Sequence, residues 1–244
     1  MSTTADAEGA GGTARSGTGW LGAARTIRRA HRVAVTHQSA SVLLGYPDQV
    51  FFERLPLVAR AVAELPRGGV RAALQEFCDH ASTTSELELC EHYVDVFDLR
   101  RRRTLYMTYY TDGDTRRRGH ALAEVKRVYA EAGWRVENRE LPDHLAVVLE
   151  FAARGDARAG EALLLRFRPG LELMSRTLHD HGTPYARIVD AVRMTLPAQE
   201  RGDLELVRRL AAQGPPAEDV GLEPYGVRAP LPRTEAPGRD GEER

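Results

Sequence analysis

Apolar residues recur along most of the chain at intervals of three and four positions, which is the period of an amphipathic helix. In the clearest stretch, one helical face carries Val70, Ala73, Leu74, Phe77 and Ala81. No segment alternates between apolar and polar residues as a half-buried strand would. The pattern therefore predicts an all-α protein, a single-domain bundle of about eight to ten short helices.

Turn and capping signals divide this pattern into elements. Asp48 follows a Gly-Tyr-Pro turn and can cap the second helix, in which Pro56 is expected to cause a break. Ser85 and Glu88 form a capping box for a helix whose inner side is expected to carry Leu87, Cys90, Val94 and Phe97. Residues 98–114 are expected to form a loop, with Asp114 capping the next helix. The later helices are expected at about 144–152, 156–167, 169–181, 184–195 and 203–212.

Composition sets the domain limits. Residues 1–24 are rich in Gly, Ala, Ser and Thr, and residues 213–244 are rich in Pro, Gly and charge. Such segments cannot bury enough apolar surface to fold, so we expect disordered tails around a helical domain at 25–212. The GxGxxG match at 17–22 has no strand before it, so we do not read it as a dinucleotide site.

Charge argues against a nucleic-acid or membrane protein. The 34 basic and 35 acidic residues give a net charge of −1, which provides no whole-protein field for anionic partners. Arg28 and Arg29 do not introduce an export signal, because Arg32 and His37 interrupt the apolar run that such a signal needs. We expect the arginine pair on an exposed helix face, and the protein in the cytoplasm without membrane insertion.

Four residues that can bind metal ions lie close to one another in the sequence, namely Cys78, His80, Cys90 and His92. Their C-x-H spacing on two helices matches no recurrent zinc pattern. We therefore expect two reduced thiols, no bound metal and no cofactor.

Glu140, Asp143 and His144 raise the alternative of an acid–base enzyme. A simpler interpretation is that Asp143 caps the helix that follows and His144 is an exposed first-turn residue. On that basis we expect no enzyme activity.

The segment from Asp98 to Gly119 has unusual content, since two arginine clusters (100–103 and 116–118) flank the aromatic run 105–110. Basic residues interleaved with aromatics can bind single-stranded nucleic acid, so a helical nucleic-acid-binding regulator is the alternative function. The arginines can equally pair internally with Asp95 and Asp98. Composition does not decide between these possibilities.

Several segments closely resemble the NarJ family, the assembly chaperones of respiratory nitrate reductase. The resemblance is carried by residues 93–103, 105–119, 43–48, 140–145 with 150–151, and 220–226. It implies an all-helical chaperone that binds the N-terminal segment of the catalytic subunit, a segment similar to a vestigial twin-arginine signal. The chaperone would hold the subunit for molybdenum cofactor insertion before membrane attachment, without joining the final enzyme. Molybdenum cofactor biosynthesis proteins are further candidate partners, and no nucleic acid is expected.

Client recognition of this kind needs an apolar groove with a charged rim. We expect the wall of this groove to be formed by aromatic and apolar residues of the two motif segments, namely Tyr93, Phe97, Leu105, Tyr106 and Tyr109. We expect Glu140 and Asp143 to meet basic client residues. His144 is expected to add a charge that changes near neutral pH.

Overall fold

The computed structural model describes residues 17–99, 103–136, 140–198, 201–213 and 216. Within these ranges the chain forms eleven α-helices and one π-helical turn, and no strand. The predicted all-α bundle is confirmed. Most of the two expected tails, including the 220–226 motif, lies outside the described residues. The first helix already begins at Gly17, so residues 17–24 are helical and not part of a disordered tail.

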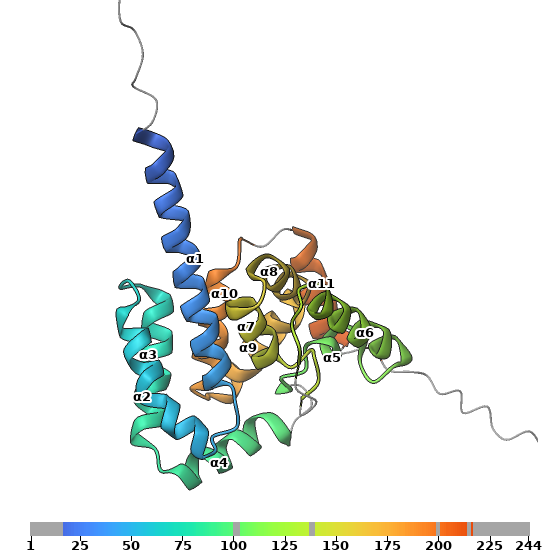
Figure 1. Cartoon of the computed structure of the whole chain (residues 1–244). Helices are drawn as coiled ribbons and strands as arrows, with labels where there is room; N and C mark the ends of the chain where they lie inside the picture. The colour runs from blue at the N-terminus through green and yellow to red at the C-terminus, as the bar shows by residue number, and fades with distance from the viewer. Residues whose placement is uncertain (1–16, 100–102, 137–139, 199–200, 214–215, 217–244) are drawn as a thin grey trace, which may run out of the picture.

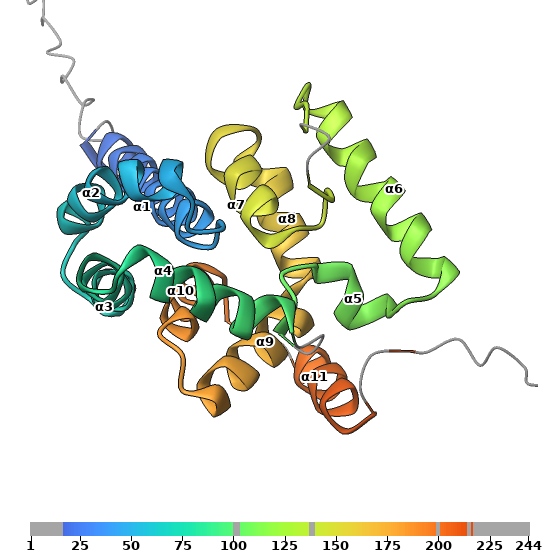
Figure 2. The same cartoon turned by 90° about the horizontal axis from the view of Figure 1, so that it is seen from below.

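Figures 1 and 2 show the arrangement of these elements from two directions. Their bounds are α1 Gly17–Leu43, α2 Gln49–Glu64, α3 Gly69–Thr83, α4 Glu86–Tyr93 with the π-turn η1 Val94–Asp98, α5 Met107–Asp112, α6 Arg116–Glu131, α7 Leu145–Arg154, α8 Ala157–Arg166, α9 Arg168–His181, α10 Tyr185–Thr195 and α11 Arg201–Gln213.

The core lies between α1, α3, α7, α9 and α10. The C-terminal half of α1 packs along α7 and α10, and α10 also packs against α3 and α9. Large side chains fill the space between these helices, and Leu43, Phe77, Phe151 and Tyr185 are each fully buried. Burial of such residues contributes roughly 1.5–3 kcal/mol apiece, which makes the apolar faces read from the sequence the main source of stability.

Two predicted capping signals give the structure expected of them, and a glycine ends a later helix. The Asp48 side chain accepts a hydrogen bond from the amide of Phe51 at 2.9 Å and caps α2. Ser85 and Glu88 form the predicted capping box at the start of α4. Gly182 ends α9 in the left-handed conformation, with φ of 75°, where a glycine carries no steric cost.

Two expectations within the first four helices are wrong. Pro56 does not break α2, which runs through it to Glu64 because Leu55 and Val58 stay buried on either side of the proline. Leu87 is 69% exposed, whereas Leu89 is fully buried. Leu89 and Tyr93 define the buried side of α4, so the inner face is not the one read from Leu87 and Cys90.

The 98–114 segment also differs from the expected loop. Its middle forms the short helix α5, which packs against α6 and α9. The N-cap of α6 is Thr115, not Asp114, and its side chain makes no capping hydrogen bond. The carboxylate of Asp114 instead pairs with Arg118 one turn into α6, at 3.3 Å.

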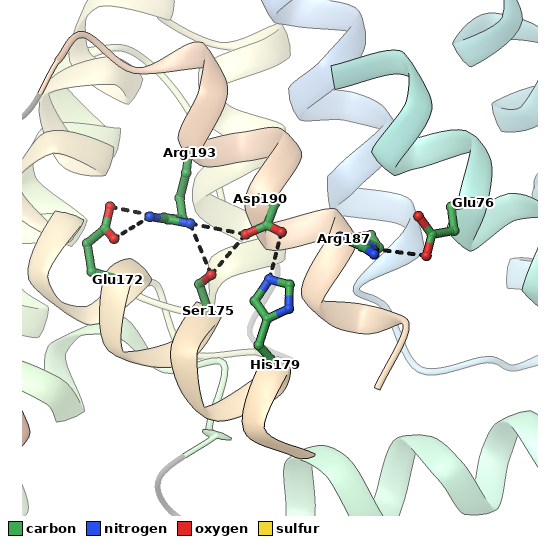
Figure 3. Close-up of polar contacts among 7 residues, drawn as sticks. All are labelled: Glu76, Glu172, Ser175, His179, Arg187, Asp190 and Arg193. Atoms are coloured by element: carbon green, nitrogen blue, oxygen red, sulfur yellow. Dashed lines mark hydrogen bonds and ion pairs between the residues drawn. The ribbon is translucent and has the colours of Figure 1, made fainter. Parts of the chain in front are cut away.

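A polar network joins α9 to α10 (Figure 3). Arg193 on α10 donates to Glu172 and Ser175 on α9, and also to Asp190 on its own helix. His179 closes the network with a 2.8 Å contact to Asp190. A hollow of about 510 Å³ is bordered by Glu172, His179, Asp190 and Arg193, but the charges on them are already paired with one another. We therefore interpret the cluster as a clamp between two helices and not as a binding site.

Candidate functional site

The two segments singled out by the sequence lie side by side. Tyr106 and His144 form an antiparallel bridge, in which the amide of Met107 donates to the carbonyl of Asp143 at 3.1 Å and the amide of Leu145 donates to the carbonyl of Leu105 at 2.8 Å. The start of α5 is thereby fixed against the start of α7. One structural unit therefore contains both the aromatic run 105–110 and the segment Pro142-Asp143-His144.

Asp143 is fully buried within this unit. Its Oδ2 accepts hydrogen bonds from the backbone amide of Thr108 at 3.0 Å and from the Thr108 hydroxyl at 2.6 Å. The N-cap of α7 is His144, so the predicted cap at Asp143 is wrong. The carboxylate stabilises the first turn of α5, a partner that lies 35 residues earlier in the chain. Asp143 is therefore a positioning residue in this structure and has no surface to offer a ligand.

His144 is also buried, with 8% of its surface exposed. Its ring packs edge-on against the ring of Tyr106, with 5.3 Å between centroids. Burial lowers the pKa of His144, although the charges of Glu140 and Asp143 act in the opposite direction. A lowered pKa keeps the imidazole neutral at pH 7, which corrects both the exposed position and the charge near neutral pH that were expected for it.

Tyr106 and Glu140 bring the unit to the surface. The Tyr106 hydroxyl donates to Glu140 Oε1 at 2.8 Å, and the Glu140 side chain is exposed. The pKa of Tyr106 is raised to about 12, mainly by burial and secondly by the hydrogen bond to Glu140. The tyrosine thus remains a donor across the physiological range and holds the carboxylate in place.

Sequence reasoning missed two residues of this unit, Thr108 and Arg118. The Arg118 guanidinium lies 5.8 Å from the centroid of the Tyr106 ring and donates to the Thr108 hydroxyl at 3.3 Å. A cation over an aromatic face is stabilising, so Arg118 supports the same tyrosine that orients Glu140. Both residues lie in the 98–119 segment, where clustering was visible but individual contacts were not.

Three of the expected wall residues belong to the core. Tyr93, Phe97 and Leu105 are 7%, 5% and 3% exposed. The Tyr93 ring contacts Phe97 at 4.9 Å and Tyr185 at 6.0 Å. Tyr109 is half-buried on α5. The apolar wall expected from these four side chains is therefore largely the interior of the bundle.

An exposed surface nevertheless borders this interior. The Tyr46 ring packs edge-on against Tyr93 at 5.3 Å and is 49% exposed. Burial raises the pKa of Tyr93, and the negative charges of Asp98 and Glu140, both exposed residues, raise it further. We refer to Tyr46, Asp98, Tyr106 and Glu140 as the acidic–aromatic face. It combines exposed ring surface with two carboxylates, which suits a ligand that is both apolar and basic.

The alternative sites find less support among the described residues. Arg103 donates to the carbonyls of Val96 and Asp95 at 2.8 and 3.0 Å, and Arg118 is held as described, so these arginines are used internally. Arg100 to Arg102 lie outside the described residues. Asp143 and Glu140 make no hydrogen bond to His144 within the described part of the chain, which leaves the acid–base set unassembled.

The cysteine and histidine residues do not converge on one point. Cys90 Sγ donates to the carbonyl of Pro47 at 3.2 Å, and His92 contacts the Thr183 hydroxyl at 2.9 Å. In the ranges that the structure describes, no group of three or more His, Cys, Asp and Glu side chains is arranged to hold a metal ion. None of the described helices has the length and apolar content needed to cross a membrane.

Comparison with known proteins places the chain in a family. The model of the family described as nitrate reductase delta subunit matches residues 64–189. The protein named probable nitrate reductase molybdenum cofactor assembly chaperone NarJ, from Bacillus subtilis (strain 168), is 29% identical over 162 residues, which cover 66% of this chain and 88% of that protein. NarJ of Escherichia coli (strain K12), a nitrate reductase molybdenum cofactor assembly chaperone, is 30% identical over 153 residues, or 62% of this chain and 64% of that one.

Two further likenesses extend this result. The nitrate reductase-like protein NarX of Mycobacterium tuberculosis (strain H37Rv) is 37% identical over 161 residues, but the match spans only 24% of that longer protein. A crystal structure from Archaeoglobus fulgidus, of a protein assigned to redox enzyme maturation, aligns with a TM-score of 0.50 and 20% identity over 66% of this chain and 91% of that one. This structural likeness supports the fold alone. The family match covers more than half of the chain, and the chain belongs to the nitrate reductase delta subunit family.

Proposed function

We propose that this chain is a system-specific assembly chaperone for a nitrate reductase. It binds the N-terminal segment of the catalytic subunit and holds that subunit for molybdenum cofactor insertion before membrane attachment. It catalyses no reaction and does not remain in the finished enzyme. The names of the NarJ relatives support the chaperone role. The observation that carries the binding role is the pairing of Tyr106 with His144, which presents Glu140 beside exposed aromatic surface.

Binding at the acidic–aromatic face follows from its chemistry. A client segment similar to a twin-arginine signal is basic and has apolar residues nearby. Its guanidinium groups meet the carboxylates of Glu140 and Asp98, and its apolar side chains cover the rings of Tyr46 and Tyr106. Tyr109 and the edge of His144 extend this contact on the α5 side. Tyr93, Phe97, Leu105 and Asp143 act from beneath, by fixing the backbone that carries the face.

The chaperone role predicts that loss of this chain leaves the client, the catalytic subunit, without its full molybdenum content. In cells that lack this chain, the nitrate reductase catalytic subunit is expected to contain severalfold less molybdenum per polypeptide. Elemental analysis of the purified subunit measures this, and a plasmid copy of the chain should restore the content. A subunit with full molybdenum in the deletion strain would contradict the proposal.

The binding role predicts a charge-dependent affinity. Glu140→Gln is expected to weaken binding of the catalytic subunit's N-terminal peptide about tenfold, because a hydrogen bond to a charged group contributes about 1.5–3 kcal/mol. Calorimetric titration at two salt concentrations measures the loss, which should be smaller at high salt since the pair lies at an exposed rim. The matched control is Glu131→Gln, an exposed carboxylate at the far end of α6. Equal affinities for wild type and Glu140→Gln would remove Glu140 from the site.

A further inference from the structure

The N-terminal half of α1 extends beyond the rest of the bundle (Figure 1). From Gly22 to Arg32 every side chain is exposed except that of Ala24, which is half-buried. Four arginines, Arg25, Arg28, Arg29 and Arg32, occupy positions i, i+3, i+4 and i+7 of this helix. That spacing places all four on one helical face.

These four arginines have no acidic residue near them in the sequence and no ion pair among the described residues. The sequence contains no Asp or Glu from Gly9 to Pro47, and no ion pair within the described residues involves any of the four. Some exposed arginines elsewhere are paired, as Arg127 is with Glu131 at 2.8 Å and Arg166 is with Glu124 at 2.7 Å, but no other helical face of the described residues carries four arginines at this spacing. Like charges one turn apart destabilise a helix, so an anion bound along this face would stabilise it.

The arginine face borders a concave surface. A hollow of about 310 Å³ is bordered by Arg29 and Arg32 on one side and by the α2–α3 connection and the end of α10 on the other. Apolar side chains contribute much of its lining, namely Val33, Leu65, Val70, Met194 and Leu196. A second hollow of about 570 Å³ continues it past Arg25 and Arg28. Both are bordered by Arg29, Arg32 and Pro66, and we refer to them together as the arginine groove.

The arginine groove lies at the opposite end of α1 from the acidic–aromatic face. Ser41, near the C-terminus of α1, donates to the carbonyl of Ala146 at 2.8 Å, two residues beyond His144. Arg32 precedes Ser41 by nine residues, which is roughly 14 Å along a helix that rises 1.5 Å per residue. The two surfaces are thus separate, and they have opposite charge.

We infer that the arginine groove is a second docking site, and that its occupant is an acidic, amphipathic polypeptide segment. Carboxylates of the segment pair with the four arginines, in the charge-assisted geometry that guanidinium groups favour. Its apolar side chains cover Leu65, Val70 and Met194. A flat lipid surface fits a concave groove poorly, and the phosphates of a nucleic acid strand make no use of an apolar lining. The inference does not depend on the proposed function.

A direct binding measurement tests this site. The probe is a fluorescein-labelled 14-residue helical peptide of Glu and Leu, compared with the same peptide carrying Gln for Glu. Wild-type chain is expected to bind the Glu peptide at least about tenfold more tightly than the Gln peptide. Arg25→Gln/Arg29→Gln should remove most of that difference. The matched control is Arg54→Gln/Arg60→Gln, which removes the same charge from exposed positions of α2 and should change affinity by less than about twofold.

A second variant tests whether the apolar lining of the arginine groove contributes to binding, or whether the four positive charges alone account for it. Met194→Ser removes apolar lining without changing charge and is expected to weaken Glu-peptide binding about threefold. Vesicles with phosphatidylglycerol and a single-stranded oligonucleotide serve as competing probes. Equal losses in the two double-arginine variants, an unchanged affinity in Met194→Ser, or arginine-dependent binding of only the vesicles or the oligonucleotide would overturn the inference. Titration of the catalytic subunit's N-terminal peptide should be unaffected by Arg25→Gln/Arg29→Gln, so failure of either site is visible separately.

Discussion

Asp143→Ala is expected to lower the free energy of unfolding by about 3 kcal/mol, because it removes a charged acceptor and leaves buried donors of Thr108 without a partner. For a domain of this size such a loss corresponds to a fall in melting temperature of roughly 6–12 °C. The first turn of α5 would lose the contact that fixes it against α7. Urea unfolding followed by circular dichroism measures the change.

An exposed aspartate gives the matched control. Asp156 caps α8 by accepting hydrogen bonds from the amides of Arg158 and Ala159, both at 2.9 Å. Asp156→Ala is expected to cost only about 1 kcal/mol, as is usual for loss of an exposed N-cap. Asp143→Asn keeps an acceptor oxygen and should fall between the two alanine variants. If Asp143→Ala costs no more than Asp156→Ala, then the buried carboxylate does not hold α5 as we describe.

The roles of these two aspartates illustrate what can be predicted from local sequence. Asp156, Asp48 and Ser85 cap the helices that directly follow them, and such contacts depend on residues two or three positions away. Asp143 precedes a helix in the same manner, yet its partner Thr108 lies on another element. Only the antiparallel pairing of residues 105–107 with residues 143–145 makes that contact possible. A helix period and a capping pattern contain no information about it.

The candidate site shows the same limit. Residues 105–107 and 143–145 belong to two of the motif segments, and they form one antiparallel pairing. Which aromatic side chains are exposed could not be predicted, because Tyr93 and Phe97 face the core whereas Tyr46 and Tyr106 reach the surface. A π-turn directly follows α4, and nothing in the apolar period of the sequence marks it.

Helices α7 and α8 approach each other closely at Gly160. A Cβ added to Gly160 would lie 2.4 Å from both Cα and Cβ of Ala152, so the two helices would have to move apart. Overpacking of this kind costs typically 1–3 kcal/mol, and here the contact includes a backbone atom that cannot rotate away. Although alanine is the better helix former by about 1 kcal/mol, Gly160→Ala is expected to destabilise the protein by about 2 kcal/mol net.

The same substitution on α6 is expected to have the opposite sign. Gly119 is exposed, and nothing lies within 4 Å of a Cβ built there. Gly119→Ala should therefore stabilise the protein by about 0.5–1 kcal/mol through helix propensity alone. Denaturant midpoints of the two variants, measured at equal m-values, give the comparison. Because the chemical change is identical, a difference of about 3 kcal/mol between them reports the α7–α8 contact at Ala152. A midpoint that rises in Gly160→Ala as it does in Gly119→Ala would mean that the helices approach less closely than 2.4 Å implies.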